Sequence, residues 1–363
     1  MESILTCRTA ARGGHVWVCD DPCTYTAVLY NSCSNRHCPT CGDAARRRWL
    51  HALSGLVLPV PHFQAVFTLP EELRLLARRF PVEVYDILFR AAAETLNQLA
   101  AKRMGAQLGM IGVLHTWTRE MLLHPHVHFL VTAGGLSLDG DRWVPTSARW
   151  LFPVGVMRTL LRGKVLAWLD DLFKAGKIAF CANATESGRI WARVKRALYG
   201  KRWVVFVEPP KKRNPTAFIS YLASYVFRVA ISEHRIIAHD DATVTFRTRG
   251  ENRITLSGGE FLRRFLLHVL PDGFRKVRYY GVLSPALRKT RYARARQALG
   301  SLVPEEERNE QDAPEVVTPQ ERVVELPVCP VCGRAALHCY RLPPLPEDAA
   351  LRKAALKKWM DSS

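Results

Sequence analysis

Hydrophobic and polar positions follow two different periods along the chain, and this pattern predicts a mixed fold. Residues 63–69 and 112–119 alternate as strands do, and residues 123–135 contain a β-branched and aromatic run. Between the first two, residues 71–102 repeat apolar side chains at helical spacing around Pro81, which predicts two helices. Strand, helices, strand and strand in this order predict an α+β fold with a central antiparallel sheet and flanking helices.

The second half of the chain continues with the same signals. Residues 203–207 are all apolar, which predicts a strand at the centre of the sheet. An Asn followed by Pro begins a predicted helix over residues 214–232. Residues 243–256 are expected to form a hairpin that turns at Gly250.

A histidine-rich hairpin carries the first candidate chemistry. His126 and His128 are two residues apart on one predicted strand, so both side chains point to the same face. If the hairpin turns near residues 120–121, His115 lies opposite His126 and joins that face. Neutral imidazoles side by side bind a divalent ion. A register slip of one residue would remove His115 and leave two alternative third ligands, His124 and Glu120.

Net charge favours a phosphate-rich partner. The 363-residue chain has 52 Lys and Arg against 33 Asp and Glu, a formal charge of +19, and its isoelectric point is near 9.8. We find no run of the roughly 20 apolar residues that span a bilayer, and no signal-peptide pattern. We therefore expect no membrane partner and a cytoplasmic protein that joins the nucleoid when bound to DNA.

Cysteines near the two ends of the chain favour metal binding over disulfides, which a reducing compartment disfavours. The pairs Cys19-x3-Cys23 and Cys38-x2-Cys41 predict one tetrahedral zinc ion with four thiolate ligands. Four further residues leave a second zinc site open: Cys7, His15, Cys33 and His37. A third, weaker candidate site lies at the other end: Cys329, Cys332 and Cys339.

Two tyrosines and several basic clusters complete the candidate residues. Tyr221 and Tyr225 are four residues apart on the predicted helix and share a face, so either can act as a nucleophile or pack in the core. The basic residues expected to contact a nucleic-acid backbone, with solvated faces as the alternative, are Arg46, Arg47, Arg48, Lys211, Lys212, Arg213, Arg228, Arg288, Lys289 and Arg291.

Several of these segments together resemble a known family. The motifs CRTAARGGH, NSCSNRHCPTC, VFTLPEEL, HPHVHFLVTAGGLS and YLASYVFRVAIS occur in this order. With them the sequence resembles the two-tyrosine transposases of the insertion sequence 91 family, which are His-hydrophobic-His (HUH) endonucleases. The resemblance covers nearly the whole chain up to Ser284.

The resemblance implies a transposase that cuts and rejoins single-stranded DNA at element ends and target sites by a rolling-circle route, without ATP. It implies Mg²⁺ or Mn²⁺ at His126 and His128, and a 5′-phosphotyrosine formed by Tyr221 or Tyr225. Structural Zn²⁺ is expected in the N-terminal domain. The expected domains are a zinc-binding domain over 1–57, an HUH nuclease domain over 58–285, a basic segment with an acidic linker over 286–325, and a CxxC segment over 326–363.

Three positions depart from the family pattern, which usually has Lys, His and Asn where this chain has Glu208, Phe227 and Glu233. The candidate nucleophiles and metal ligands are intact, so we expect an active enzyme. Two other functions remain open. One is a non-catalytic zinc-dependent DNA-binding protein whose histidine strand is structural, and the other is a plasmid relaxase or replication initiator with the same chemistry.

Overall fold

The computed structural model describes residues 2–19, 23, 25–35, 37–147, 151–210, 230–300, 328–334 and 337–344. The chain forms two compact units, Met1–Ala45 with Ala313–Ser363, and Arg46–Asp312. The expected first and last domains thus share one unit, and its boundary with the larger unit lies inside helix α2 (Pro39–Ser54). Helices and antiparallel sheets together confirm the predicted α+β class. Over the described ranges, no helix is both long and apolar enough to cross a membrane.

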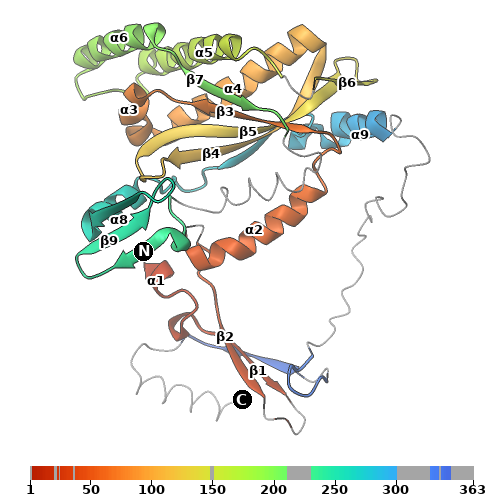
Figure 1. Ribbon diagram of the computed structural model, residues 1–363, viewed down its shortest axis with the longest axis vertical. Coiled ribbons are helices and arrows are strands. Elements are labelled where there is room, and N and C mark those ends of the chain that lie inside the picture. The colour runs from red at the N-terminus through yellow and green to blue at the C-terminus, as the bar shows by residue number, and fades with distance from the viewer. Residues whose placement is uncertain are drawn as a thin grey trace. The chain divides into compact units, whose positions relative to one another are not determined.

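An antiparallel sheet of six strands forms the centre of the larger unit (Figure 1). Its order is β11, β4, β5, β3 and β7, and β6 pairs with β5. These strands are β3 (His62–Thr68), β4 (Ala106–Trp117), β5 (Leu123–Ser137), β6 (Trp143–Pro145), β7 (Val204–Glu208) and β11 (Val277–Gly281).

Helices cover one face of this sheet (Figure 1). They are α3 (Arg74–Arg79), α4 (Pro81–Met104), α5 (Val154–Lys174) and α6 (Ala184–Gly200). Alternate residues of β3, such as Phe63 and Phe67, are fully buried against them, as the period of two predicts. Pro81 occupies the first turn of α4, where its missing N–H costs nothing, so the predicted interruption between two helices is confirmed.

At one end of the opposite face of the sheet, described helices pack against β4 and β5. There Ile111 of β4 and Leu130 of β5 pack with Leu53 of α2 and Ala295 of α9 (Ala293–Gly300). A turn of 3-10 helix (Pro285–Leu287) and a π-helical turn (Arg288–Tyr292) lead into α9. The candidate histidines lie farther along the same face. Side chains two or four residues apart on a strand share a face, and His115 is four residues from Ile111 whereas His128 is two residues from Leu130.

β7 departs from the prediction that residues 203–207 lie at the centre of the sheet. It pairs with β3 alone and forms an edge of the sheet within the described chain. Val205 is buried under the helices, whereas Val204 and Phe206 on the other face are 57% and 54% exposed. An apolar run indicates burial on both faces in general, but among the described residues a helical layer covers only one face of β7.

A smaller sheet of three strands follows in the larger unit: β8 (Ile236–His239), β9 (Thr243–Arg247) and β10 (Arg253–Ser257). β9 and β10 form the predicted hairpin, with Gly250 at φ +60° in its turn. α8 (Gly258–Leu266) comes directly after β10, and Ser257 caps it by accepting a hydrogen bond from the Glu260 amide.

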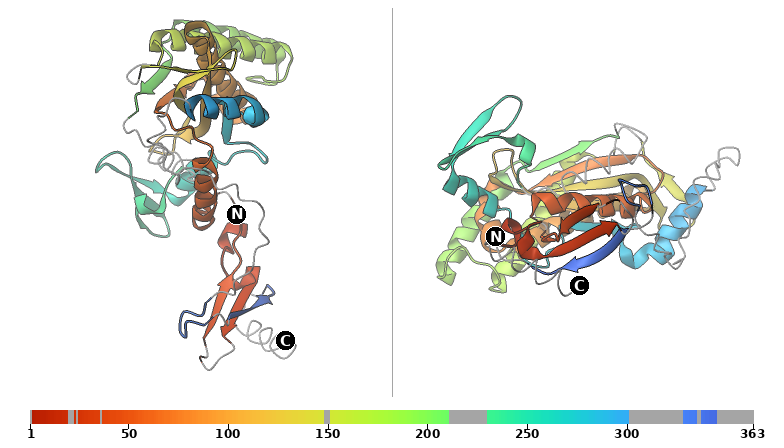
Figure 2. Two further views of the ribbon diagram at one scale, coloured as in Figure 1. Left: turned by 90° about the vertical axis from the view of Figure 1, so that its right-hand side faces the viewer. Right: turned by 90° about the horizontal axis from the view of Figure 1, so that it is seen from below.

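The smaller unit contains a sheet built from both ends of the chain. Its order is β12 (Leu337–Leu342), β1 (Gly14–Cys19) and β2 (Thr26–Tyr30). In Figure 2 the blue strand β12 runs beside the red strand β1, and the two are antiparallel from Gly14 opposite Leu342 to Cys19 opposite Leu337. A short helix α1 (Glu2–Leu5) and a 3-10 turn (Ala10–Arg12) precede β1.

Candidate functional site

Three histidines from β4 and β5 gather at one end of this face of the large sheet. The register is the one expected, because His115 lies directly opposite His126. Ligand nitrogens of His115, His126 and His128 all lie within 4.8 Å of one another, and the ring centroids are 4.4 to 5.3 Å apart. This spacing lets the three imidazoles share one metal ion.

Neighbouring groups orient the two β5 histidines. Nδ1 of His126 donates to the carbonyl oxygen of His124 at 2.7 Å, which leaves Nε2 as the nitrogen with a lone pair. Nε2 of the Gln64 side chain, on β3, donates to Nδ1 of His128 at 3.0 Å. A half-turn of this amide would place its oxygen there instead, so that Nδ1 would donate and Nε2 of His128 would be the metal-binding nitrogen.

The three rings are neutral at physiological pH. Burial lowers the pKa of His126 to about 4. Burial, assisted by the neighbouring His126, lowers the pKa of His128 to about 3. Burial also holds the pKa of His115 well below its ordinary value, and His128, His126 and Lys276 add to this effect. Protons therefore do not compete with a metal ion for these nitrogens near pH 7.

The turn between β4 and β5 is fastened by three side chains of the later chain. Arg235 donates to the carbonyl oxygen of Arg119. Arg264, on α8, donates to that of Glu120 at 3.0 Å. His268 then lies 3.1 Å from the carbonyl oxygen of the next residue, Met121. Three consecutive carbonyls thus connect the histidine hairpin to residues 235–268.

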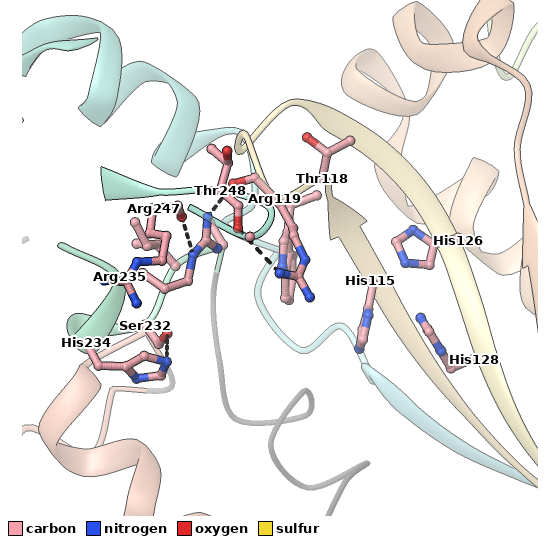
Figure 3. A pocket seen from close by; sticks show the side chains of 14 residues that line it. His115, Thr118, Arg119, His126, His128, Ser232, His234, Arg235, Arg247 and Thr248 are labelled. Carbon is pink, nitrogen blue, oxygen red and sulfur yellow. Dashed lines mark hydrogen bonds between the residues drawn. The ribbon is translucent and has the colours of Figure 1, made fainter. Parts of the chain in front are cut away.

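A cationic pocket of about 480 Å³ opens beside the histidines. Figure 3 shows the three imidazoles at one side and Arg119, Arg235 and Arg247 toward the other. Arg235 donates through Nε to the carbonyl oxygen of Arg247 at 2.8 Å, so one guanidinium holds the backbones of the other two arginines. Among the described residues that line this pocket, none is acidic. The pocket therefore suits an anionic ligand next to the candidate metal ion.

The cysteines form two groups of four, both inside the smaller unit. In the first group, Sγ of Cys7 lies 3.4 Å from Sγ of Cys41 and 3.6 Å from that of Cys38, and Cys33 completes the set. The second group contains Cys19, Cys23, Cys329 and Cys332.

This grouping corrects the expectation that Cys19, Cys23, Cys38 and Cys41 share one ion. Cys19 ends β1, and the pairing of β1 with β12 brings the C-terminal cysteines to it instead. Three other candidate ligands lie outside both groups. His15 is an exposed residue of β1, His37 contacts the Asn35 side chain, and the exposed Cys339 is opposite Trp17 in the sheet.

The other candidate residues differ in their exposure to solvent, and several lie outside the described part of the chain. Arg47, Arg48, Arg288 and Lys289 are exposed, and Arg46 is half-buried. The guanidinium of Arg291 donates to the carbonyl oxygens of Ser137 and Leu138. Glu208 on β7 is opposite Gln64. Six candidate residues and one departure lie outside the described residues: Tyr221, Tyr225, Lys211, Lys212, Arg213, Arg228 and Phe227.

Sequence reasoning missed several residues around the histidines. In the sequence, Gln64 is a polar residue within an otherwise apolar strand, and this pattern indicates a functional contact. His268 is a lone buried histidine, and Arg119, Arg235 and Arg247 are isolated among many arginines. For these four, only the tertiary fold indicates a role.

Comparisons with known proteins show which family the chain matches. Residues 109–291 match the family described as "Putative transposase", and residues 1–69 match the family described as "Transposase zinc-binding domain". "Putative transposase y4qJ" of Sinorhizobium fredii is 41% identical over 314 residues, 84% of this chain and 78% of that protein. The "Transposase for insertion sequence element IS801" of Pseudomonas savastanoi pv. phaseolicola is 32% identical over 300 residues, 77% of this chain and 68% of that protein. No solved structure matches the chain significantly.

Proposed function

This chain belongs to the insertion sequence 91 family of transposases, and we propose that it cuts and rejoins single-stranded DNA through a metal-assisted phosphotyrosine intermediate. The observation that carries this proposal is the cluster of His115, His126 and His128 at the edge of a cationic pocket. Membership of a transposase family favours transposition over the biology of a plasmid relaxase.

The histidine cluster fits a divalent cation. Three neutral imidazoles supply one nitrogen each, and the pocket beside them leaves room for further ligands such as phosphate oxygens. When bound, such an ion would neutralise charge on the non-bridging oxygens of the scissile phosphate. Imidazole ligands suit Mn²⁺ better than Mg²⁺, which prefers oxygen ligands.

The protein's own residues would supply the nucleophile and the positioning. Tyr221 or Tyr225 forms a bond from its phenol oxygen to phosphorus while the bond from phosphorus to the 3′ oxygen breaks. The phenol gives up its proton, and the departing 3′ oxygen takes up one to become a 3′-OH. A phenol has an ordinary pKa near 10, so positioning beside neutralised phosphate oxygens is needed. The phosphotyrosine ester conserves the bond free energy, so a DNA 3′-OH can rejoin the strand without ATP.

The pocket arginines would hold the DNA strand. Arg119 and Arg247 are exposed residues whose backbones are fixed by Arg235, so their guanidiniums are presented to the pocket from two different hairpins. Guanidinium groups bind phosphate through paired hydrogen bonds. We infer that each of them contacts a backbone phosphate near the scissile one.

Covalent attachment tests the proposal directly. Purified protein is incubated with labelled single-stranded DNA that carries the element's end, in Mn²⁺, Mg²⁺ or EDTA, and denaturing gels detect a protein–DNA adduct. We expect an adduct in Mn²⁺ that disappears in EDTA. Tyr221→Phe and Tyr225→Phe are made singly and together, with Tyr199→Phe, an exposed tyrosine of α6, as the matched control.

The double variant should form no adduct, whereas the Tyr199 variant should match the wild type. An adduct that persists in the double variant contradicts the nucleophile assignment. The competing function, a non-catalytic zinc-dependent DNA-binding protein, gives a different result. It predicts oligonucleotide binding that survives His126→Ala with His128→Ala, and no cleavage with any metal.

A further inference from the structure

Two cysteine pairs from opposite ends of the chain meet in the smaller unit. Sγ of Cys19 lies 3.6 Å from Sγ of Cys332, and Sγ of Cys23 lies 3.4 Å from Sγ of Cys329. All four sulfur atoms are within 4.8 Å of one another. The match to the zinc-binding family ends at residue 69, so it includes only the first pair.

The sulfur distances fit a tetrahedral ion and exclude disulfides in this arrangement. A disulfide joins its sulfurs at about 2.05 Å, much shorter than either distance. Four thiolates around zinc, each about 2.3 Å from the ion, lie about 3.8 Å from one another by tetrahedral geometry. The two measured distances are close to that value, so small adjustments would admit an ion at the centre of the group.

The C-terminal pair has the local geometry of a zinc knuckle. In the segment Cys329-Pro-Val-Cys332-Gly333, the backbone amides of Val331 and Cys332 donate to Sγ of Cys329. The Gly333 amide donates to the carbonyl oxygen of Cys329 at 2.9 Å, and Gly333 has φ +70°, which glycine adopts without strain. Amides that point at a sulfur atom stabilise the negative charge of a thiolate ligand.

The surrounding sheet holds the two pairs together independently of any ion. β12 follows the knuckle and pairs with β1 along its whole length, so Cys19 lies opposite Leu337. Trp17 and Tyr25 pack beside the same cysteines and exclude water from one side of the group. The four thiols are therefore placed by the fold, as a structural metal site requires.

We propose that Cys19, Cys23, Cys329 and Cys332 hold a second structural zinc ion, which joins the N-terminal zinc-binding domain to the C-terminal segment. Four sulfur ligands close the tetrahedron and leave no position for water or substrate, so this ion has no part in catalysis. The first ion belongs to Cys7, Cys33, Cys38 and Cys41, all within the residues matched by the zinc-binding family. This inference does not depend on the proposed DNA chemistry.

Zinc content of the purified full chain tests the proposal. We expect two zinc ions per chain in the wild type by elemental mass spectrometry, and one in the double variant Cys329→Ser with Cys332→Ser. The matched controls Cys339→Ser and Cys181→Ser remove cysteines outside both groups and should retain two. One ion in the wild type, or two in the Cys329/Cys332 double variant, overturns the proposal.

A measurement on the wild type covers the case in which the double variant fails to fold. Native protein is treated with a thiol-alkylating reagent, and peptides are quantified by mass spectrometry. Cys329 and Cys332 should be protected until a strong zinc chelator is added, whereas the exposed Cys339 should react at once. Alkylation of Cys329 and Cys332 in zinc-loaded protein at the rate of Cys339 contradicts the proposal.

Discussion

Nε2 of His268 lies 3.1 Å from the carbonyl oxygen of Met121, and Nδ1 of the same ring lies 3.1 Å from Oγ1 of Thr116. A carbonyl oxygen only accepts, so Nε2 carries the proton and donates, while Nδ1 accepts from the Thr116 hydroxyl. Thr116 directly follows His115, and Met121 lies in the turn that leads to β5. His268 therefore ties strand and turn of the histidine hairpin together and is a positioning residue.

Replacing His268 tests this role. His268→Phe keeps an aromatic ring but leaves the Met121 carbonyl and the Thr116 hydroxyl without this partner. We expect the free energy of unfolding to fall by about 1–3 kcal/mol, and Mn²⁺ affinity to fall about tenfold, as is typical when groups supporting metal ligands are lost. Urea unfolding and Mn²⁺ titration measure both. His239→Phe, at an exposed histidine of β8, is the control. Unchanged Mn²⁺ affinity would show that the hairpin keeps its geometry without His268.

The same residue predicts a pH dependence of stability. Burial lowers the pKa of His268 to about 4, and the unfolded chain has the ordinary value near 6.5. Between these values the unfolded chain binds a proton that the folded chain does not, so stability is complete above pH 6.5 and decreases toward pH 4. The decrease from this group is at most about 3 kcal/mol. In EDTA, His268→Phe should lose less stability than the wild type between pH 7 and 4.5, and equal losses would contradict this account.

Gln64 provides a test of the metal site that distinguishes its two amide orientations. Gln64→Glu offers only acceptor oxygens to Nδ1 of His128, so it should retain or raise Mn²⁺ affinity. Gln64→Leu removes the partner and should lower Mn²⁺ affinity about 10–100-fold. Electron paramagnetic resonance of free Mn²⁺ measures both. Equal affinity in the two variants would show that Gln64 does not orient His128.

The pocket arginines predict a change in the salt dependence of DNA binding. Each phosphate contact to single-stranded DNA contributes about 0.7 to the slope of log affinity against log salt. Arg119→Gln with Arg247→Gln should reduce the slope by about 1.4 and weaken binding about 25-fold near 0.1 M salt. Arg193→Gln with Arg196→Gln removes the same charge from exposed positions of α6 and should leave the slope nearly unchanged. Fluorescence anisotropy titrations with DNA in EDTA measure binding without cleavage. Identical salt slopes in the two double variants would exclude a specific contact of Arg119 and Arg247 with DNA phosphates.

The ligand set predicts a metal preference. His115, His126 and His128 provide nitrogen ligands, which Mn²⁺ accepts more readily than Mg²⁺. Adduct formation should therefore reach half its maximum at a lower concentration of Mn²⁺ than of Mg²⁺. A lower requirement for Mg²⁺ would point to oxygen ligands from outside the three histidines.

The features set by local sequence could be predicted. Strand alternation places His126 and His128 on one face, and the short connection between the strands fixes His115 opposite His126. Pro81 separates two helices because proline suits a first turn and not a helix interior.

Features that depend on distant partners could not be predicted. The spacing of Cys19 and Cys23 indicates half of a zinc site but not which second pair lies beside it, and the pair that the structure places there is about 300 residues away in sequence. The apolar run of β7 indicates a strand, but its edge position depends on the whole sheet order. The hydrogen bonds from Arg235, Arg264 and His268 to one turn are invisible to any local pattern, because they join separate elements.

The pairing of β1 with β12 also sets the order in which the two units are completed during synthesis. A ribosome adds about 5–20 residues per second, so Cys329 is made about 15–60 s after Cys23. All strands of the large sheet are translated within that interval. β1 and β2 must therefore wait for β12, whereas the histidine hairpin already has its sheet partners. A prematurely terminated chain would have a nearly complete six-stranded sheet, but its sheet of β1 and β2 would lack β12.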